Sequence, residues 1–439
     1  MNVMNKVAIA AAVVVIPVAL LAAQPAVSQV APGGNGGSTG SSGAAGHVRA
    51  ARHDRAAHHG RATGSNWAAG HDAETGSGGR AGQAGQAGRG GQAGRGGQAG
   101  QAGRKILALA RAELTKNDLH SVIVSVREGR RVLITRALGT TMTGIPATTK
   151  MHFRVGSVAF AYLSTLLLKL RDEGRLSLSE RLSRFFPKLP HASQITLADL
   201  IETRSGYADF VAQPSFLKVL NAHPFRHWTQ RELVAIGTNP KLFGTTGKFR
   251  YAHTNFVLLG EALTKITGMP LARLMRQQIF TPLGLTGTNI SSTPQIPAPV
   301  LHAFITAQGV YQESTYWNPS WTAGTGEIMT SDIGDLIRSA VGIGTGALLT
   351  KRSYRQQISH ISHVAPGVYY GMGIFISNGW LLQNPLFSGY NAVMAYLPAR
   401  HISIAVTTTL GPRSDPNTNY STDLTKQIAV YLAPRRPIR

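Results

Sequence analysis

The chain has 439 residues, with 44 lysines and arginines against 20 aspartates and glutamates, a formal net charge of +24 and no cysteine. The missing cysteines exclude disulfide bonds and a lipid-modified cysteine anchor, so the fold must be stable through side-chain packing alone. The positive charge favours salt-sensitive attraction to anionic surfaces, and we expect no nucleic-acid partner because no recognition motif accompanies the charge.

The first 28 residues have the pattern of an export signal. A short polar start contains Lys6, residues 7–23 form an apolar run interrupted by Pro17, and small residues at positions 26–28 offer a cleavage site. An uncleaved membrane anchor is the alternative, but the apolar run is shorter than a comfortable membrane span. We therefore expect a secreted or otherwise extracytoplasmic protein.

Residues 29–104 form a second segment, rich in glycine, alanine, glutamine and arginine. Such a segment has too few large apolar side chains to offset its ordering entropy, so we predict a disordered basic linker before a folded domain at residues 105–439. Glycine occupies every third position from 82 to 103, a spacing typical of collagen. A flexible spacer is favoured over a triple helix because no proline stiffens the repeat.

The folded domain begins with a predicted β-hairpin, in which residues 122–126 and 132–137 flank a turn at Gly129. Helical patterns follow Ser157, Leu197, Arg231, Thr254 and Asp332. Later strands are expected at residues 369–377, 393–397 and 402–408, with a closing helix at residues 423–432. This order predicts an α+β fold, in which helices flank one antiparallel sheet built from both chain ends and a mainly helical subdomain lies between them.

Ser157 is the strongest candidate for a catalytic nucleophile. It follows a strand-like run and precedes an apolar helical run, so it lies where a helix begins. Unpaired backbone N–H groups at such a position stabilise developing negative charge, although a helix-capping serine is the simpler alternative. In a Ser-x-x-Lys site the residue three positions later supplies the amine that takes the serine proton, and here that residue is Phe160.

Ser157 is part of a longer series of motifs. Residues 153–157 read Phe-Arg-Val-Gly-Ser, and residues 173–178 read Glu-Gly-Arg-Leu-Ser-Leu. Together with later segments they resemble the serine β-lactamase and penicillin-binding-protein family, in particular its branch of class C β-lactamases, DD-peptidases and esterases. The resemblance implies a β-lactamase/transpeptidase-like fold over about residues 105–435. The further matching segments are residues 195–201, 205–207, 247–260, 280–285 and 323–326, with Ser331 and Asp332.

The resemblance also implies where the other functional groups lie. The family's second motif is Tyr-x-Asn, and here Tyr251 is present while His253 replaces the asparagine. The third motif should fall just before Gly389, which places Gln383 where the family has a lysine or a histidine. The implied catalytic residues are Ser157, Tyr251 and His253. The implied substrate-binding residues are Phe160, Gln383, Ser388 and Gly389.

Two other segments match the family's motifs, and two histidines lie close together in the sequence, but we assign no function to them. Residues 215–218 read Ser-Phe-Leu-Lys and residues 316–318 read Tyr-Trp-Asn, but both lie outside the context of the motifs, and we interpret them as coincidence. His360 and His363 lack a further ligand at a useful spacing, so we expect no metal and no cofactor.

Three functions remain open on the sequence alone. Losing a general base typically costs about 10²–10⁴-fold in rate, which favours an impaired or inactive serine hydrolase homologue that binds cell-wall peptide or a small ester or amide. The first alternative is an active esterase or D-amino-acid peptidase that uses Ser157 with Tyr251 or His253 as base, although no carboxylate stands out to orient the histidine. The second is a basic protein that adheres to anionic wall polymers or a membrane surface.

Overall fold

The computed structural model describes residues 89–439 except 292, 308 and 323–327, with side chains from residue 100 onward. The predicted export signal and most of the predicted linker, residues 1–88, lie outside the described residues. Among the helices of the described part, none is both long enough and apolar enough to cross a membrane.

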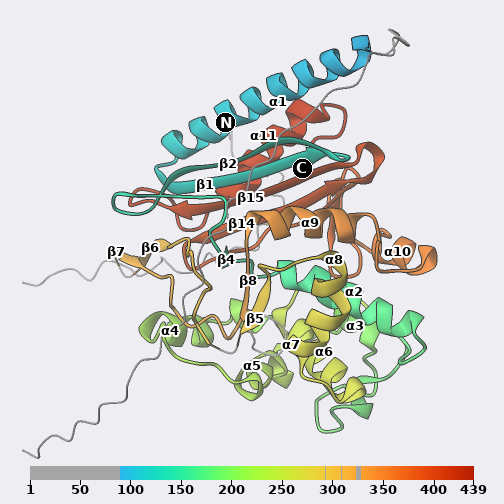
Figure 1. Ribbon diagram of the computed structural model, residues 1–439. Coiled ribbons are helices and arrows are strands. Elements are labelled where there is room, and N and C mark those ends of the chain that lie inside the picture. The colour runs from blue at the N-terminus through green and yellow to red at the C-terminus, as the bar shows by residue number, and fades with distance from the viewer. Residues whose placement is uncertain (1–88, 292, 308, 323–327) are drawn as a thin grey trace, which may run out of the picture. The chain divides into compact units, whose positions relative to one another are not determined.

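A ten-stranded antiparallel sheet joins the two ends of the folded domain (Figure 1). Nine strands follow the order β3-β2-β1-β15-β14-β12-β11-β10-β9, and β13 pairs with β14. The central pair is β1 with β15, in which Val124 lies opposite Val406, so the predicted sheet built from both chain ends is confirmed. The strands are β1 (Leu119–Glu128), β2 (Arg131–Met142), β3 (Ile145–Pro146), β9 (Ser362–Ala365), β10 (Val368–Tyr370), β11 (Phe375–Ser377), β12 (Trp380–Gln383), β13 (Leu386–Phe387), β14 (Tyr390–Leu397) and β15 (Ile402–Leu410).

Helices cover both faces of this sheet. Figure 1 shows α1 (Arg89–Lys116) and α11 (Tyr420–Leu432) on one face and α9 (Ile333–Gly344) on the other. The side-chain amide of Gln427 in α11 donates a hydrogen bond of 2.8 Å to the carboxylate of Glu113 in α1. The closing helix expected at residues 423–432 is therefore present and holds α1 against the sheet.

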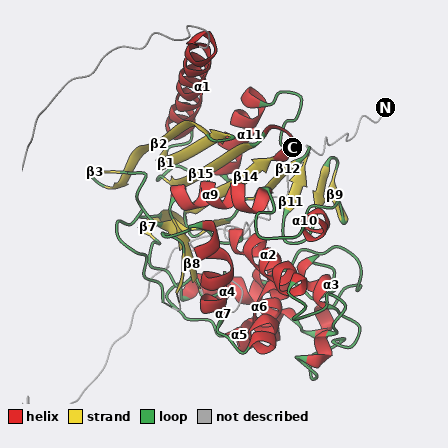
Figure 2. Ribbon diagram, turned by 45° about the vertical axis from the view of Figure 1, so that its right-hand side comes forward, coloured by secondary structure: helices red, strands yellow, loops and turns green. Residues whose placement is uncertain are grey.

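A mainly helical subdomain lies on the far side of α9 from the sheet (Figure 2). Its central helices are α2 (Val158–Asp172), of which 12 residues are buried, and α6 (His253–Thr267). The shorter helices of the chain are α3 (Leu197–Ile201), α4 (Pro214–Ala222), α5 (Gln230–Gly237), α7 (Leu271–Met275), α8 (Thr281–Leu283) and α10 (Lys351–Gln357), with single turns η1 (Leu182–Arg184), η2 (Phe210–Ala212), η3 (Pro240–Leu242) and η4 (Arg276–Phe280). A further turn, η5 (Pro398–Arg400), connects β14 to β15 in the large sheet. Two small sheets are formed by β4 (Phe153–Arg154), β8 (Ile328–Ser331) and β5 (Asn289–Ser291), and by β6 (Phe304–Ala307) with β7 (Val310–Glu313).

The single strand predicted at residues 369–377 is wrong, because the chain reverses direction within it. Strand β10 ends at Tyr370, β11 begins at Phe375, and the Gly371 N–H donates to the Ile374 carbonyl at 3.0 Å. Gly373 in this turn has a φ of 65°, which favours glycine. The sequence predicted one strand because the alternating apolar pattern continues across this tight turn.

Helix α1 begins at Arg89, before the predicted linker boundary at residue 104. The glycine spacing explains part of this difference. A side chain on Gly103 would place its Cβ 2.5 Å from the backbone carbonyl oxygen of Leu133 in β2, so the missing side chain lets the helix lie close to the sheet. Tertiary packing of Ile106 and Ala110, both fully buried, stabilises a helix that glycine alone would disfavour.

Two alanine substitutions in α1 test this docking. Gly103→Ala should lower the free energy of unfolding by about 1–3 kcal/mol because its Cβ collides with β2. Gly100→Ala is the matched control: the nearest atom to its Cβ is the Arg104 guanidinium at 3.5 Å, and the substitution should stabilise the helix by about 0.5–1 kcal/mol. Denaturant unfolding measures both values, and equal effects would contradict a docked α1.

Candidate active site

One cleft brings together the segments that carry the predicted catalytic residues. It encloses about 490 Å³ of unfilled space that is open to solvent. Its walls come from the start of α2, the start of α6, the stretch after β7, strand β11 and the segment between β12 and β14. The lining residues are Gly156, Ser157, Tyr251, His253, Trp321, Thr322, Phe375, Asn384, Pro385, Leu386 and Phe387.

Ser157 immediately precedes α2, but its side chain makes no capping hydrogen bond. Gly156 before it has a φ of 44°, and a Cβ at that position would lie 2.6 Å from the ring of Phe387. Glycine is therefore required both by the backbone conformation and by the close approach of the ring. The helix-capping interpretation of Ser157 is not supported, and its hydroxyl is left for other contacts.

The Tyr251 hydroxyl is the side-chain partner of Ser157. Burial raises the pKa of Tyr251 above its usual range, the negative charge of Asp209 raises it further, and the hydrogen bond from Ser157 opposes both effects. Tyr251 is consequently a neutral phenol, and a phenolate base is disfavoured.

His253, the first residue of α6, is paired with a carboxylate that sequence reasoning missed. Its Nδ1 lies 3.1 Å from Oδ1 and 3.2 Å from Oδ2 of Asp209, and its backbone N–H donates to the same carboxylate at 3.2 Å. Asp209 is buried, with 7% of its surface exposed. An ionised carboxylate at Nδ1 favours the tautomer with a proton on Nδ1, which leaves Nε2 as a proton acceptor.

Local hydrogen bonds hold Asp209 in place. Its carboxylate accepts a hydrogen bond from the Val211 N–H at 3.1 Å and so begins the turn η2. The neighbouring Ala208 carbonyl accepts the Thr254 hydroxyl at 2.6 Å, which ties this turn to the first residues of α6. In the sequence, Asp209 is marked only by its position after the Ser-Gly turn at residues 205–206. No motif links it to His253.

The backbone N–H of Leu386 is directed away from β14. The adjacent Pro385 carbonyl accepts a hydrogen bond from the Ala392 N–H at 3.1 Å, while Leu386 itself lies opposite Asn391. Hydrogen-bonded and non-hydrogen-bonded pairs alternate along antiparallel strands, so Leu386 occupies a non-hydrogen-bonded position. Leu386 and Ser157 line the same cleft, and their N–H groups are candidates for binding an oxyanion.

The cleft wall is largely aromatic and uncharged. Trp321 and Phe387 meet edge to face with their ring centroids 5.9 Å apart, and both are backed by a buried apolar cluster that includes Phe216 and Trp228. Within the described part of the chain, no residue that lines the cleft is a lysine, arginine, aspartate or glutamate. Sequence reasoning missed Trp321 and Thr322, because no motif marks them.

The four residues predicted to bind substrate are not among those that line the cleft. Phe160 and Gln383 are buried, with 1% and 0% exposed, and the Gln383 amide donates to a backbone carbonyl at 2.6 Å. Ser388 and Gly389 form the turn between β13 and β14. Strand β12 ends at Gln383, and residues 384–387, which continue the same pairing register along β14, line the cleft instead.

The remaining patterns lie away from the cleft lining. Ser215 and Lys218 are exposed on α4, and Tyr316 is exposed as well. Neither the Ser-Phe-Leu-Lys segment nor the Tyr-Trp-Asn segment therefore contributes to the lining of the cleft. The family-like turn at residues 323–326 lies outside the described residues. The described residues contain no cluster of three or more histidine, aspartate or glutamate side chains that could hold a metal ion.

Comparison with known proteins agrees with this geometry. The Beta-lactamase family model matches residues 106–427. The putative penicillin-binding protein PbpX of Bacillus subtilis is 24% identical over 246 residues, which are 56% of this chain and 58% of PbpX. A putative D-alanyl-D-alanine carboxypeptidase of Escherichia coli is 27% identical over 33% of this chain and 35% of its own length. Each match spans less than two thirds of the relative.

Solved structures show the same fold. The D-stereospecific amidohydrolase from a Streptomyces species has a TM-score of 0.64 and 23% identity, and the match covers 76% of this chain and 99% of that one. The D-amino acid amidase from Ochrobactrum anthropi, complexed with L-phenylalanine amide, has a TM-score of 0.65 and 20% identity with the same coverage. These likenesses confirm the predicted β-lactamase/transpeptidase-like fold.

Proposed function

The chain belongs to the beta-lactamase family, and on that premise we propose that it is an exported serine acyl hydrolase that has lost the family's lysine-dependent reaction. In the lysine's place, Ser157 is the nucleophile and His253, oriented by Asp209, is the base. The observation that carries the proposal is the contact of 3.1 Å between the His253 imidazole and the Asp209 carboxylate beside the cleft that holds Ser157.

The reaction needs one proton acceptor that acts in both the acylation of Ser157 and the hydrolysis of the acyl group. Nε2 of His253 takes the proton of Ser157 as the serine oxygen attacks an ester carbonyl, and the imidazolium then gives that proton to the leaving alcohol. The acyl group is now bonded to Ser157. A water molecule gives a proton to Nε2 and attacks the acyl carbonyl. The imidazolium then gives that proton to the serine oxygen as the bond to the acyl group breaks, which releases the acid and restores Ser157 and neutral His253. Asp209 stays ionised and stabilises the imidazolium in both steps.

The cleft favours uncharged acyl groups. Cephalosporins and D-Ala-D-Ala peptides carry a carboxylate, and a buried carboxylate requires a cationic or hydrogen-bonding partner. The described lining offers no lysine or arginine for that purpose, whereas Trp321 and Phe387 offer apolar aromatic surface. We therefore expect small esters or amides with an apolar or aromatic acyl group. The related amidase has been solved with L-phenylalanine amide and with phenylalanine itself, ligands that share an aromatic side chain.

The test compares covalent labelling and turnover in the wild-type protein and Ser157→Ala. A fluorophosphonate should label the wild-type protein, a nitrophenyl ester of a neutral short acid should be hydrolysed, and Ser157→Ala should abolish both. Cephalosporins and D-Ala-D-Ala peptides should be turned over negligibly by either protein, because the described lining of the cleft offers no cationic partner for their carboxylate. Robust cephalosporin hydrolysis that depends on Ser157 would contradict the proposed loss of that reaction.

A second candidate function is binding without turnover. It is favoured by Tyr251, which is the direct partner of Ser157 and whose raised pKa makes it a poor base. In that case the cleft would bind cell-wall peptide or another extracytoplasmic ligand, and the net charge of +24 would hold the protein on anionic wall polymers or a membrane surface. Absence of both fluorophosphonate labelling and ester turnover would favour this candidate over the first.

A further inference from the structure

The imidazole of His253 is enclosed on several sides at once. Asp209 contacts its Nδ1, and three aromatic rings meet it at steep angles: Phe160 at 5.4 Å between centroids, Phe210 at 6.0 Å and Tyr251 at 5.5 Å. Only 14% of the His253 side chain is exposed. A ring packed in this way has little room to rotate, so its free edge in the cleft is the edge away from Asp209.

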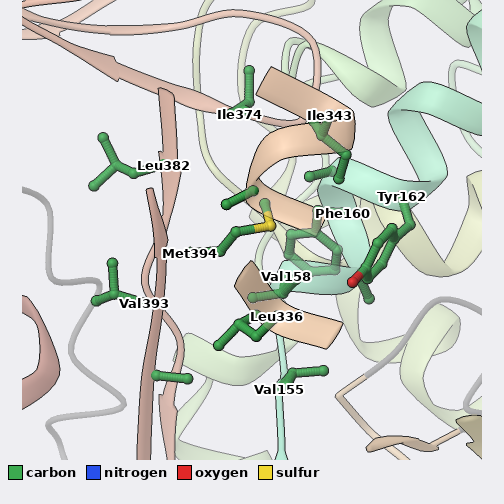
Figure 3. Packing of buried hydrophobic residues seen from close by; sticks show 14 of the residues in the cluster. Val155, Val158, Phe160, Tyr162, Leu336, Ile343, Ile374, Leu382, Val393 and Met394 are labelled. Carbon is green, nitrogen blue, oxygen red and sulfur yellow. The ribbon is translucent and has the colours of Figure 1, made fainter. Parts of the chain in front are cut away.

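Phe160 is itself held by Phe256. The two rings stack with 3.6 Å between centroids and 3° between planes, and Phe160 is part of the buried core in Figure 3. His253 and Phe256 are three residues apart on α6 and therefore share one face of that helix. Phe160, which comes from α2, contacts both, so the stack connects the core to the imidazole.

We propose that Phe160 is a positioning residue that orients His253, and that positions 160 and 253 act as one unit. This inference rests on the proposed function. A lysine at position 160 would place an ammonium beside the imidazole, where like charge disfavours the imidazolium formed during the reaction. It would also remove the flat surface that contacts His253. The two departures from the family pattern thus form a single change, from a lysine base to a histidine base.

A double-mutant cycle tests the coupling. Phe160→Leu should lower kcat for ester hydrolysis by about tenfold or more, with KM changed by less than about twofold, because the ring that aims His253 is lost. In the His253→Asn background the same Phe160→Leu change should have no further effect on kcat. Phe160→Met provides a second apolar replacement, with an unbranched and flexible side chain, if Phe160→Leu does not fold.

Tyr162→Leu is the matched control for loss of a buried aromatic ring. Tyr162 lies on the same helix, but it packs against Phe280 and hydrogen-bonds Ser339, away from the cleft. Its loss should lower the melting temperature without changing kcat at 25 °C. Nitrogen-15 NMR gives a further readout: His253 should show a single Nδ1–H tautomer in the wild-type protein and a mixture in Phe160→Leu.

The outcomes separate the two proposals. If Phe160→Leu lowers kcat equally in both backgrounds, or if Tyr162→Leu reproduces the loss, the positioning role of Phe160 is overturned while the proposed function stands. If His253→Asn leaves Ser157-dependent ester turnover unchanged, the proposed function is wrong and the positioning role is overturned with it.

Discussion

Replacing His253 with asparagine should lower kcat for ester hydrolysis by about 10²–10⁴-fold with little change in KM, because the substitution removes the base but not the cleft. Steady-state kinetics with a nitrophenyl ester measures the effect.

Two further substitutions sharpen this prediction. Asp209→Asn keeps an oxygen that can accept the Val211 and His253 backbone N–H groups, but it removes the charge that fixes the tautomer, so we expect a loss of about a hundredfold in kcat with little change in melting temperature. Tyr251→Phe removes only a neutral phenol and should cost about tenfold or less. A larger loss in Tyr251→Phe than in His253→Asn would show that the base has been assigned to the wrong residue.

The sequence predicted the fold from patterns that are local in the chain. Residues 122–126 and 132–137 are joined by a two-residue turn at Gly129, so their pairing follows from the alternation of side chains. Helix α1 was missed because its stability comes from docking. Composition assigns a low helix propensity to a glycine-rich segment, and nothing in it reveals that Gly103 meets the backbone of β2.

The sequence predicted half of the candidate site for a similar reason. Ser157, Tyr251 and His253 lie within short motifs at the starts of two helices, and all three line the cleft. Asp209 lies 44 positions before His253, and their contact depends on how a turn packs against α6. In the third segment, residues 384–387 line the cleft directly after Gln383, and no motif in the sequence marks which residues of this segment do so.

Phe256→Ala should lower the free energy of unfolding by about 3–5 kcal/mol, because Phe256 is fully buried and its loss leaves a cavity under the Phe160 ring. For a domain of this size the melting temperature should fall by roughly 10 °C. Below that temperature the protein should remain folded, but kcat for ester hydrolysis should also fall, since Phe160 loses the surface that keeps it against His253. Calorimetry and kinetics at 25 °C measure the two effects.

Leu263→Ala distinguishes loss of stability from loss of alignment. Leu263 is fully buried on α6, seven residues after Phe256 and therefore on the same face, and its truncation should cost about 2–5 kcal/mol. It is almost three helical turns away from His253, so kcat at 25 °C should stay at the wild-type level despite the lower melting temperature. If both variants lost kcat to the same degree, general loosening of α6 would explain the effect. If Phe256→Ala alone loses kcat, the cause is the stack of Phe256 and Phe160 against the imidazole.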